Sequence, residues 1–321
     1  EHGASNHPVR DCLKAAGYTV IPVEAQCTPD PDFSQTKTPN PEEADAYIEV
    51  LALAKKEDCD LILVCDPDGD RMGVGIRHSN GDYVIFNGNQ TGALLLEYIL
   101  STMKEKGLMP ENPVMFNTIV TSDIGEAVAS YYGVETEKTL TGFKYIGDKV
   151  AKYEKDHAKN YVFGYEESYG SLIKPFVRDK DATQACVMLA EACAYYREKG
   201  KTLKDVLNEI YDRLGAYYDS QLSISLPGQD GAVKLQKIMS EMRENPIKEI
   251  DGNKVVKYED YKERKVYEGD KVTALEGYDV TDVLKYYFAD GSFVAIRPSG
   301  TEPKCKFYIE VVDKSLKKAD E

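Results

Sequence analysis

An acidic stretch, C-D-P-D-G-D-R-M-G at residues 65–73, carries the strongest chemical signal in the chain. It places Asp66, Asp68 and Asp70 at alternate positions, so three carboxylates can converge on one side of an extended loop. Carboxylates held this close repel one another unless a cation neutralises them, and hard oxygen ligands suit Mg²⁺. The stretch therefore predicts a magnesium site, with a solvated acidic turn as the alternative. Arg71 adjoins this site and could hold a phosphate there by paired hydrogen bonds.

Two other acidic loops can be tested on the same letters. An EF-hand loop that began at Asp66 would need glycine at its sixth place and glutamate at its twelfth, and this chain has Arg71 and Arg77 there. A haloacid-dehalogenase loop would have a small hydroxyl or apolar residue where this chain has Asp70. Neither pattern fits, which favours a magnesium loop of another kind.

A second loop, R-P-S-G-T-E-P-K, follows the apolar segment S-F-V-A-I near the end of the chain. Its two cationic side chains supply positive charge, its hydroxyls can donate hydrogen bonds, and its glycine lets backbone N–H groups approach an anion. A plain β-turn is the alternative. The predicted phosphate-binding residues are Arg297, Ser299, Gly300, Thr301 and Lys304.

Three further stretches carry weaker signals. G-Y-E-E-S-Y-G brackets Glu166 and Ser168 with glycines, and both side chains could hydrogen-bond neighbouring sugar hydroxyls, although an exposed turn would have the same composition. L-T-G-F-K-Y-I-G and V-R-D-K-D offer Lys144 and Lys180 as contacts for phosphate or hydroxyl groups. Most lysines are simply solvated, so these stretches gain weight only together with the others.

The elements that must position these loops can be predicted from periodicity. The metal loop follows L-I-L-V-C, a continuous apolar strand of the kind that parallel sheets bury on both faces. It would then lie at the carboxyl end of a buried strand, where open α/β sheets place their ligands. An amphipathic helix from Val9 and a strand through Val20–Val23 precede it.

Further along, helix and strand signals alternate up to Gly215, and β-like segments around one helix follow. We therefore expect an α/β fold class: two related three-layer α/β domains, then a smaller α+β domain with a mainly antiparallel sheet. The predicted domains are residues 1–86 with the metal loop, 87–215 with the sugar-binding loop, and 216–321 with the phosphate-binding loop.

Composition restricts the partners. The formal net charge of the 321 residues is -15, which argues against nucleic acid or an anionic membrane as a partner. The seven cysteines are scattered singly, which favours reduced thiols in a cytoplasmic protein. No apolar run is long enough to span a bilayer. A small anionic ligand remains possible where Arg and Lys gather locally.

Taken in order, these loops resemble one family, the α-D-phosphohexomutases, which include phosphoglucomutase and phosphomannomutase. Residues Asp66–Arg71 match its D-x-D-G-D-R magnesium loop. Gly164–Ser168 match its G-E-E/M-S sugar loop with a tyrosine inserted, and Arg297–Thr301 match its R-x-S-G-T phosphate loop. The resemblance covers essentially the whole chain and is closest to the bacterial phosphoglucomutase branch that also includes phosphopentomutases.

The resemblance implies a function. A phosphoserine would exchange phosphate with glucose 1-phosphate and glucose 6-phosphate through glucose 1,6-bisphosphate, with Mg²⁺ on the three aspartates. Arg71 would stand beside the metal, and Lys180 would handle a proton or contact phosphate. The Arg297–Thr301 loop would hold the non-reacting phosphate. The residues expected to line the sugar site are Thr141, Gly142, Lys144, Glu166 and Ser168. Alternatives are a phosphomannomutase or phosphopentomutase, and a non-catalytic sugar-phosphate-binding protein.

The opening residues E-H-G-A-S-N-H-P resemble the family's nucleophile loop, T-A-S-H-N-P, but differ from it in two ways. Ser5 is too close to the metal loop for a whole domain to lie between them, and its histidine and asparagine are reversed. The stretch better fits the H-G-x-G/S loop of the family's second domain, with Ser5 as a loop or helix-capping residue. We therefore expect family domains two to four, without the N-terminal serine domain, and no turnover by this chain alone.

Overall fold

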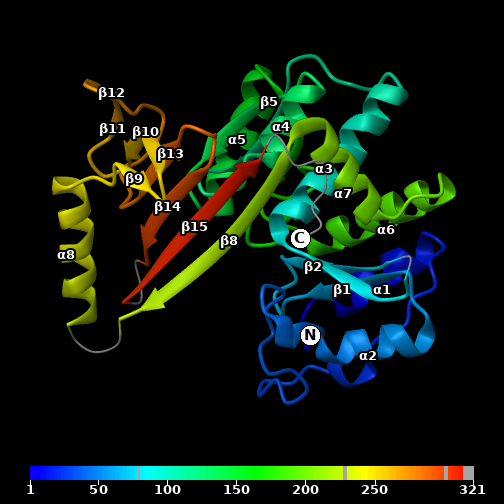
Figure 1. The fold of residues 1–321 in the computed structure, drawn as a ribbon. Helices are drawn as coiled ribbons and strands as arrows, with labels where there is room; N and C mark the ends of the chain where they lie inside the picture. The colour runs from blue at the N-terminus through cyan, green and yellow to red at the C-terminus, as the bar shows by residue number, and fades with distance from the viewer. Residues whose placement is uncertain (79, 227–229, 300–302, 314–321) are drawn as a thin grey trace. The chain divides into compact units, whose positions relative to one another are not determined.

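The computed structural model describes residues 1–78, 80–226, 230–299 and 303–313. The chain divides into two compact units, Glu1–Leu214 and Gly215–Glu321. Unit 1 contains the predicted metal and sugar loops, and unit 2 the predicted phosphate loop (Figure 1). No helix among the described residues is long and apolar enough to cross a membrane.

The first part of unit 1 is built around a small antiparallel sheet of order β1-β2-β3. Its elements are α1 (Asn6–Ala15), η1 (Glu24–Gln26), η2 (Ala44–Tyr47), α2 (Ile48–Glu57), β1 (Leu61–Cys65), β2 (Met72–Arg77) and β3 (Tyr83–Phe86). The strand predicted at Leu61–Cys65 is confirmed, but the expectation that it belongs to a parallel sheet was wrong. The metal loop turns the chain straight back, so that Cys65 pairs with Met72 in an antiparallel ladder.

The strand predicted through Val20–Val23 is also absent, because these residues belong to no ladder among the described ones. They line a cavity of about 580 Å³ together with the residues of β1. Periodicity identified the apolar segment correctly but could not indicate whether another strand lies beside it.

The second part of unit 1 is a helix-flanked sheet of order β5-β4-β6-β7. Strand β4 pairs in parallel with β5 and β6, and β7 pairs antiparallel with β6. Its elements are α3 (Gly88–Glu105), β4 (Pro113–Thr118), α4 (Ile124–Tyr131), β5 (Glu135–Thr139), α5 (Phe143–Asp156), β6 (Asn160–Tyr165), β7 (Ser171–Leu172), α6 (Ala182–Glu198) and α7 (Leu203–Leu214). The parallel strands bring Thr118 and Tyr165 to one edge of the sheet, where the sugar loop begins.

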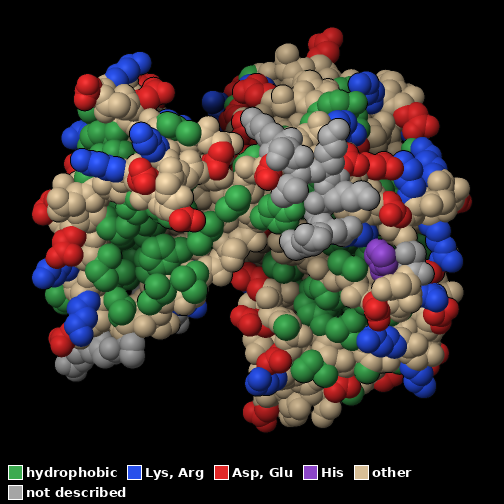
Figure 2. Space-filling model, in the orientation of Figure 1, with side chains coloured by type: hydrophobic (Ala, Val, Ile, Leu, Met, Phe, Trp, Pro, Cys, Tyr) green, Lys and Arg blue, Asp and Glu red, His purple; other side chains and the backbone are tan. Residues whose placement is uncertain are grey.

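Unit 2 is an antiparallel sheet of order β12-β11-β10-β13-β14-β15-β8, with β9 paired to β10. Its elements are β8 (Ala216–Ser225), α8 (Gly231–Glu244), β9 (Glu249–Ile250), β10 (Asn253–Asp260), β11 (Lys265–Glu268), β12 (Lys271–Ala274), β13 (Leu284–Phe288), β14 (Phe293–Pro298) and β15 (Lys304–Asp313). Leu235 and Met239 of α8 pack on Leu284 and Ile296. Figure 2 shows apolar side chains gathered on the visible face of this unit.

The predicted fold class, α/β elements followed by an α+β unit with an antiparallel sheet, is confirmed. The division into three domains at residues 86 and 215 stays a prediction, because the compact units divide the chain once, after Leu214.

Tyr165, the last residue of β6, fixes where the sugar loop leaves the sheet. Its ring is buried, and two helices approach it through glycines. A Cβ atom at Gly92 of α3 would lie 2.3 Å from Cδ2 of the ring, and one at Gly125 of α4 would lie 2.1 Å from its hydroxyl oxygen. Glycine inside a helix costs about 1 kcal/mol relative to alanine. Both glycines are therefore explained by the space that the ring needs.

We expect Gly125→Ala to lower the free energy of unfolding of unit 1 by about 1–3 kcal/mol, because the added methyl group overpacks the Tyr165 hydroxyl. In a Tyr165→Phe background the closest clashing atom is gone, so the same substitution should cost less. Urea unfolding of the four proteins measures both costs. Equal costs in the two backgrounds would contradict this explanation.

Candidate functional site

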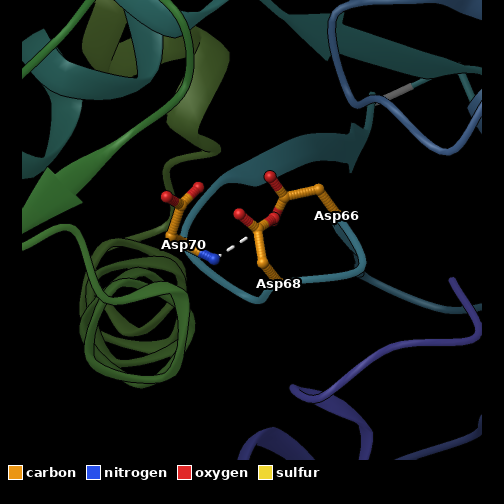
Figure 3. A group of neighbouring side chains, drawn as sticks. All are labelled: Asp66, Asp68 and Asp70. Atoms are coloured by element: carbon orange, nitrogen blue, oxygen red, sulfur yellow. Dashed lines mark hydrogen bonds between the residues drawn. The ribbon is translucent and has the colours of Figure 1, made fainter. Parts of the chain in front are cut away.

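The metal loop connects β1 to β2 and gathers the three predicted aspartates. One ligand oxygen from each of Asp66, Asp68 and Asp70 lies within 4.8 Å of the other two. The backbone N–H groups of Asp70 and Arg71 both donate to Asp66 Oδ1, at 3.1 and 3.0 Å. Figure 3 shows the carboxylates of Asp66 and Asp68 side by side. Gly69 permits this tight turn with a φ of +76°.

The electrostatics of the loop fit a divalent cation. Burial raises the pKa of Asp66 to about 7; the Arg71 N–H opposes this rise, and the carboxylates of Asp70 and Asp68 add to it. The buried Oδ1 atom of Asp70 has no hydrogen-bond partner among the described residues. Crowded carboxylates and an unsatisfied buried oxygen are what a hard cation such as Mg²⁺ neutralises.

The opening residues pack directly on this loop. Ala4 N donates to Pro67 O at 2.8 Å, and a Cβ atom at Gly3 would lie 2.2 Å from the same oxygen. Ser5 is the N-cap residue of α1, as the sequence suggested, but its side chain makes no capping hydrogen bond. Its own φ and ψ, -74° and -12°, are helical, whereas a capping side chain normally needs an extended backbone.

Arg71 lies beside the carboxylates, as predicted. Its Nε atom is 3.5 Å from Asp66 Oδ2, and its Nη1 atom is 3.5 Å from Glu42 Oε1. About a third of its side chain remains exposed. Glu42 was missed by sequence reasoning, because it stands in a proline-rich segment with no motif around it. The guanidinium thus lies between Asp66 and Glu42, and its side chain is partly exposed.

Lys180 reaches the metal loop from the segment before α6. Its Nζ atom is 2.9 Å from Asp70 Oδ2 and 3.0 Å from Asp179 Oδ1. Burial alone would lower the pKa of Lys180, but the hydrogen bonds to Asp70 and Asp179 outweigh it and raise that pKa above its ordinary value. Its stem passes over Gly170, where a Cβ atom would lie 2.0 Å from Cδ of the lysine. Lys180 is therefore held as an ammonium group next to the aspartates.

The sugar loop places Glu166 in the same region. This carboxylate is 7% exposed and accepts a hydrogen bond from Gly142 N at 2.9 Å. Burial raises its pKa to about 7; neighbouring Glu167 adds to the rise, and Lys180 and the Gly142 N–H oppose it. Gly142 can make this contact because its φ is +114°. A buried acid with a raised pKa beside a lysine is a common property of binding and catalytic sites.

The other predicted sugar contacts lie around this pair. Thr141 and Ser168 are half-buried; Thr141 directly precedes Gly142, and Ser168 is two positions after Glu166. Lys144 is exposed in the first turn of α5, and its Nζ atom lies 4.8 Å from the Tyr145 ring centre. The roles of these three residues as substrate contacts stay predictions.

The backbones of the metal and sugar loops are joined to each other. Met72 N donates to Tyr169 O at 3.0 Å, and Arg71 and Gly170 form an antiparallel bridge. Tyr169 adopts a left-handed φ of +70° within this junction. The two loops are nearly a hundred residues apart in sequence, and this pairing makes them one continuous surface.

Glu167 holds the sugar loop to the segment around the end of β4. Sequence analysis did not predict this role. The hydroxyls of Thr118 and Thr121, at the end of β4, donate to its Oε2 atom at 3.1 and 2.9 Å. The second glutamate of the E-E pair was the available signal, and nothing in the local sequence indicated its threonine partners.

The phosphate loop of unit 2 is described only at its two ends. Arg297 lies on β14 opposite Lys306 of β15, and Ser299 N donates to Lys304 O at 2.7 Å. Gly300 and Thr301 lie outside the described residues. Arg297 and Lys304 therefore lie on two paired strands, and phosphate binding there stays a prediction.

Three models of one family match the chain in order. The phosphoglucomutase/phosphomannomutase alpha/beta/alpha domain II matches residues 1–81, domain III matches residues 87–214, and the C-terminal domain matches residues 262–319. Phosphoglucomutases of Staphylococcus aureus strains MRSA252 and MSSA476 are each 40% identical over 312 residues. The match covers 97% of this chain and 55% of each relative, so the chain spans about half the length of these curated relatives.

Solved structures show the same fold at low identity. Parafusin of Paramecium, an exocytosis-sensitive phosphoprotein, aligns over 90% of this chain and 48% of its own with a TM-score of 0.61 and 20% identity. A phosphoglucomutase/phosphomannomutase family protein of Burkholderia thailandensis aligns over 97% of this chain and 55% of its own, with a TM-score of 0.64 and 18% identity. With the metal loop and the ordered domain matches, these likenesses lead to one conclusion: the chain belongs to the phosphoglucomutase/phosphomannomutase family.

Proposed function

We propose that this chain provides the metal, sugar and phosphate sites of a phosphoglucomutase. The observation that carries the proposal is the convergence of Asp70, Lys180 and Glu166, which come from three separate segments. Asp70 and Lys180 are 2.9 Å apart, and Lys180 acts electrostatically on Glu166. Such a site offers cation ligands, a fixed positive charge and a hydrogen-bonding acid within one surface, as a sugar phosphate requires.

The aspartates Asp66, Asp68 and Asp70 would hold Mg²⁺, which neutralises charge on a phosphoryl group in transfer. Arg71 would orient that phosphoryl group by paired hydrogen bonds, since about a third of its side chain is exposed. The raised pKa of Lys180 favours a phosphate contact over a role as proton acceptor, because an ammonium group has no lone pair to accept a proton.

The sugar would be held by Glu166 and Ser168 from the sugar loop and by Thr141, Gly142 and Lys144 from the turn before and the start of α5. The Gly142 N–H donates to Glu166 Oε1 and orients the carboxyl group. In this orientation, Glu166 Oε2 would accept a hydrogen bond from a sugar hydroxyl. In unit 2, the turn from Arg297 to Lys304, with Ser299, Gly300 and Thr301, would bind a phosphate group.

The reaction we propose interconverts glucose 1-phosphate and glucose 6-phosphate through a phosphoserine and glucose 1,6-bisphosphate. No T-A-S-H-N-P loop occurs in the 321 residues, and Ser5 stands at the N-cap position of α1, so we place the phosphoserine outside this chain. The chain alone should then bind metal and sugar phosphate without turnover. Glucose is preferred over mannose and pentoses in this proposal, because the curated relatives at 40% identity are named phosphoglucomutases.

A coupled mutase assay tests this proposal. The 321-residue chain and a full-length protein that contains it are each given the 1-phosphates of glucose, mannose, glucosamine and ribose. We expect turnover by the full-length protein only, with the highest kcat/KM for glucose 1-phosphate. Enzyme-like turnover by the chain alone would overturn the placement of the nucleophile, and a preference for another sugar would overturn the substrate assignment.

A further inference from the structure

Two buried thiols face each other inside unit 1, next to the metal loop. The Sγ atoms of Cys65 and Cys186 are 3.7 Å apart, although the residues are 121 positions apart in sequence. Cys65 is the last residue of β1 and directly precedes the metal ligand Asp66, and Cys186 lies early in α6. All seven cysteines are free. Among them, this pair has the sulfur-to-sulfur contact that the structure describes.

The two sulfurs of this pair are in van der Waals contact. A disulfide bond is about 2.05 Å long, so the two sulfurs need to approach by roughly 1.7 Å. Rotation about the side-chain bonds moves a cysteine sulfur without moving its backbone, so this approach asks for side-chain movement first. The contact joins a strand end to a helix, and both are packed in one compact unit.

A small oxidant has a route to these thiols. Cys65 lines the cavity of about 580 Å³, as do Ala190 and Cys193 of α6. The same cavity is lined by Glu57 and Arg197, which are exposed, so it reaches the protein surface. Cys186 is fully buried behind Cys65 and can meet a modified Cys65 sulfur without leaving the interior.

We propose that Cys65 and Cys186 form an oxidation site that hydrogen peroxide converts to a disulfide. In the first step the Cys65 sulfur attacks one peroxide oxygen, the O–O bond breaks, and Cys65 sulfenic acid and one water form. In the second step the Cys186 sulfur attacks the sulfenic sulfur, the S–O bond breaks, and a second water leaves with the Cys186 proton. Two thiols are oxidised to one disulfide, and one peroxide is reduced to two waters.

The disulfide fastens the metal loop to α6. Cys65 holds the start of that loop, and α6 follows Lys180, which already pairs with Asp70 at 2.9 Å. A second, covalent link then joins the same two segments, and it closes a loop of 121 residues. Cross-linking a loop this long reduces the freedom of the unfolded chain, so unit 1 should become harder to unfold.

The test treats the 321-residue chain with hydrogen peroxide, blocks remaining thiols, and maps linked peptides by mass spectrometry. We expect one peptide pair that joins Cys65 to Cys186 and a thermal midpoint of unit 1 that rises by several degrees. Dithiothreitol should reverse both. Cys186→Ser should show neither, whereas Cys193→Ser, on the same helix and cavity, should behave like the parent chain.

Each other outcome overturns a stated part of the proposal. If no Cys65–Cys186 link forms, or if Cys65 links to Cys193 instead, the oxidation site is wrong. If the link forms and the thermal midpoint does not rise, the fastening of the metal loop to α6 is wrong. None of these readouts uses a sugar phosphate, so they stand apart from the mutase assay.

Discussion

Replacing Asp68 with alanine is expected to remove Mg²⁺ binding from this chain while leaving unit 1 folded. Asp68 is the exposed member of the aspartate cluster, so its side chain contributes little to packing. Its carboxylate also repels its neighbours, and this repulsion is one cause of the raised pKa of Asp66. A metal site that loses one of three anionic ligands should lose at least about 100-fold in affinity, since changes outside the ligand set already cost about 10–100-fold.

Isothermal titration of Mg²⁺ into the parent chain, Asp68→Ala and Asp148→Ala measures this effect. Asp148 is exposed on α5 and is not a member of the aspartate cluster, so its replacement controls for the change in net charge. The Asp148 variant should keep the parent affinity. Parent-like binding by Asp68→Ala, or no binding by the parent chain, would contradict the metal assignment. In the full-length protein, Asp68→Ala should abolish activity on every sugar.

The metal loop could be predicted from sequence because all its parts are contiguous. The spacing of Asp66, Asp68 and Asp70 is a local property, and a short loop leaves few ways to place three alternate side chains. The phosphate loop is also a contiguous motif, and its described ends, Arg297 and Lys304, lie on paired strands, but its role stays a prediction. Such motifs need no knowledge of the rest of the fold.

The partners of these loops could not be predicted, because tertiary packing chooses them. The local sequence does not distinguish Lys180 from the other lysines of the chain. The structure does, because its Nζ atom lies 2.9 Å from Asp70 Oδ2. Glu42 has no local signal, and it meets Arg71 only because the chain before α2 folds over the metal loop. A contact between residues far apart in sequence cannot be predicted from the local sequence pattern around either residue.

The predicted direction of strand pairing was wrong for a similar reason. The residues of β1 form a continuous apolar run, which is typical of parallel sheets, yet β1 pairs antiparallel with β2. The metal loop itself reverses the chain direction between β1 and β2. Its aspartates predicted a metal site, but they did not predict this reversal. Burial of both faces sets the composition of a strand, and the connection to the next strand sets its direction.

Glu166→Gln is the substitution that should change stability and function in opposite directions. The pKa of Glu166 is about 7 in the folded protein and 4.5 ordinarily. Below pH 4.5, Glu166 is protonated in both the folded and the unfolded state, so its ionisation does not lower the free energy of unfolding. Between pH 4.5 and 7 the unfolded state loses its proton first, and stability falls. Above pH 7 the full penalty applies, at roughly 3 kcal/mol.

Glutamine carries no charge at any of these pH values, and its side-chain oxygen can still accept from Gly142 N. The variant should therefore match the parent near pH 4.5 and exceed it by roughly 2–3 kcal/mol in free energy of unfolding at pH 8. Urea unfolding of unit 1 from pH 4.5 to 8 measures the difference. Glu198→Gln, at the exposed end of α6, should show no such divergence from the parent. A constant difference across this range would contradict the burial of the Glu166 charge.

The same variant should have lower mutase activity. An amide oxygen accepts weaker hydrogen bonds from sugar hydroxyls than a carboxylate does. In the full-length protein we expect a lower kcat/KM and a changed ranking among glucose, mannose, glucosamine and ribose 1-phosphates. Sites that keep a destabilising group commonly do so for function, and their removal then stabilises the fold. If Glu166→Gln leaves both the rate and the ranking unchanged while stability rises, Glu166 is a buried acid without contact to the sugar, and the sugar-loop assignment fails.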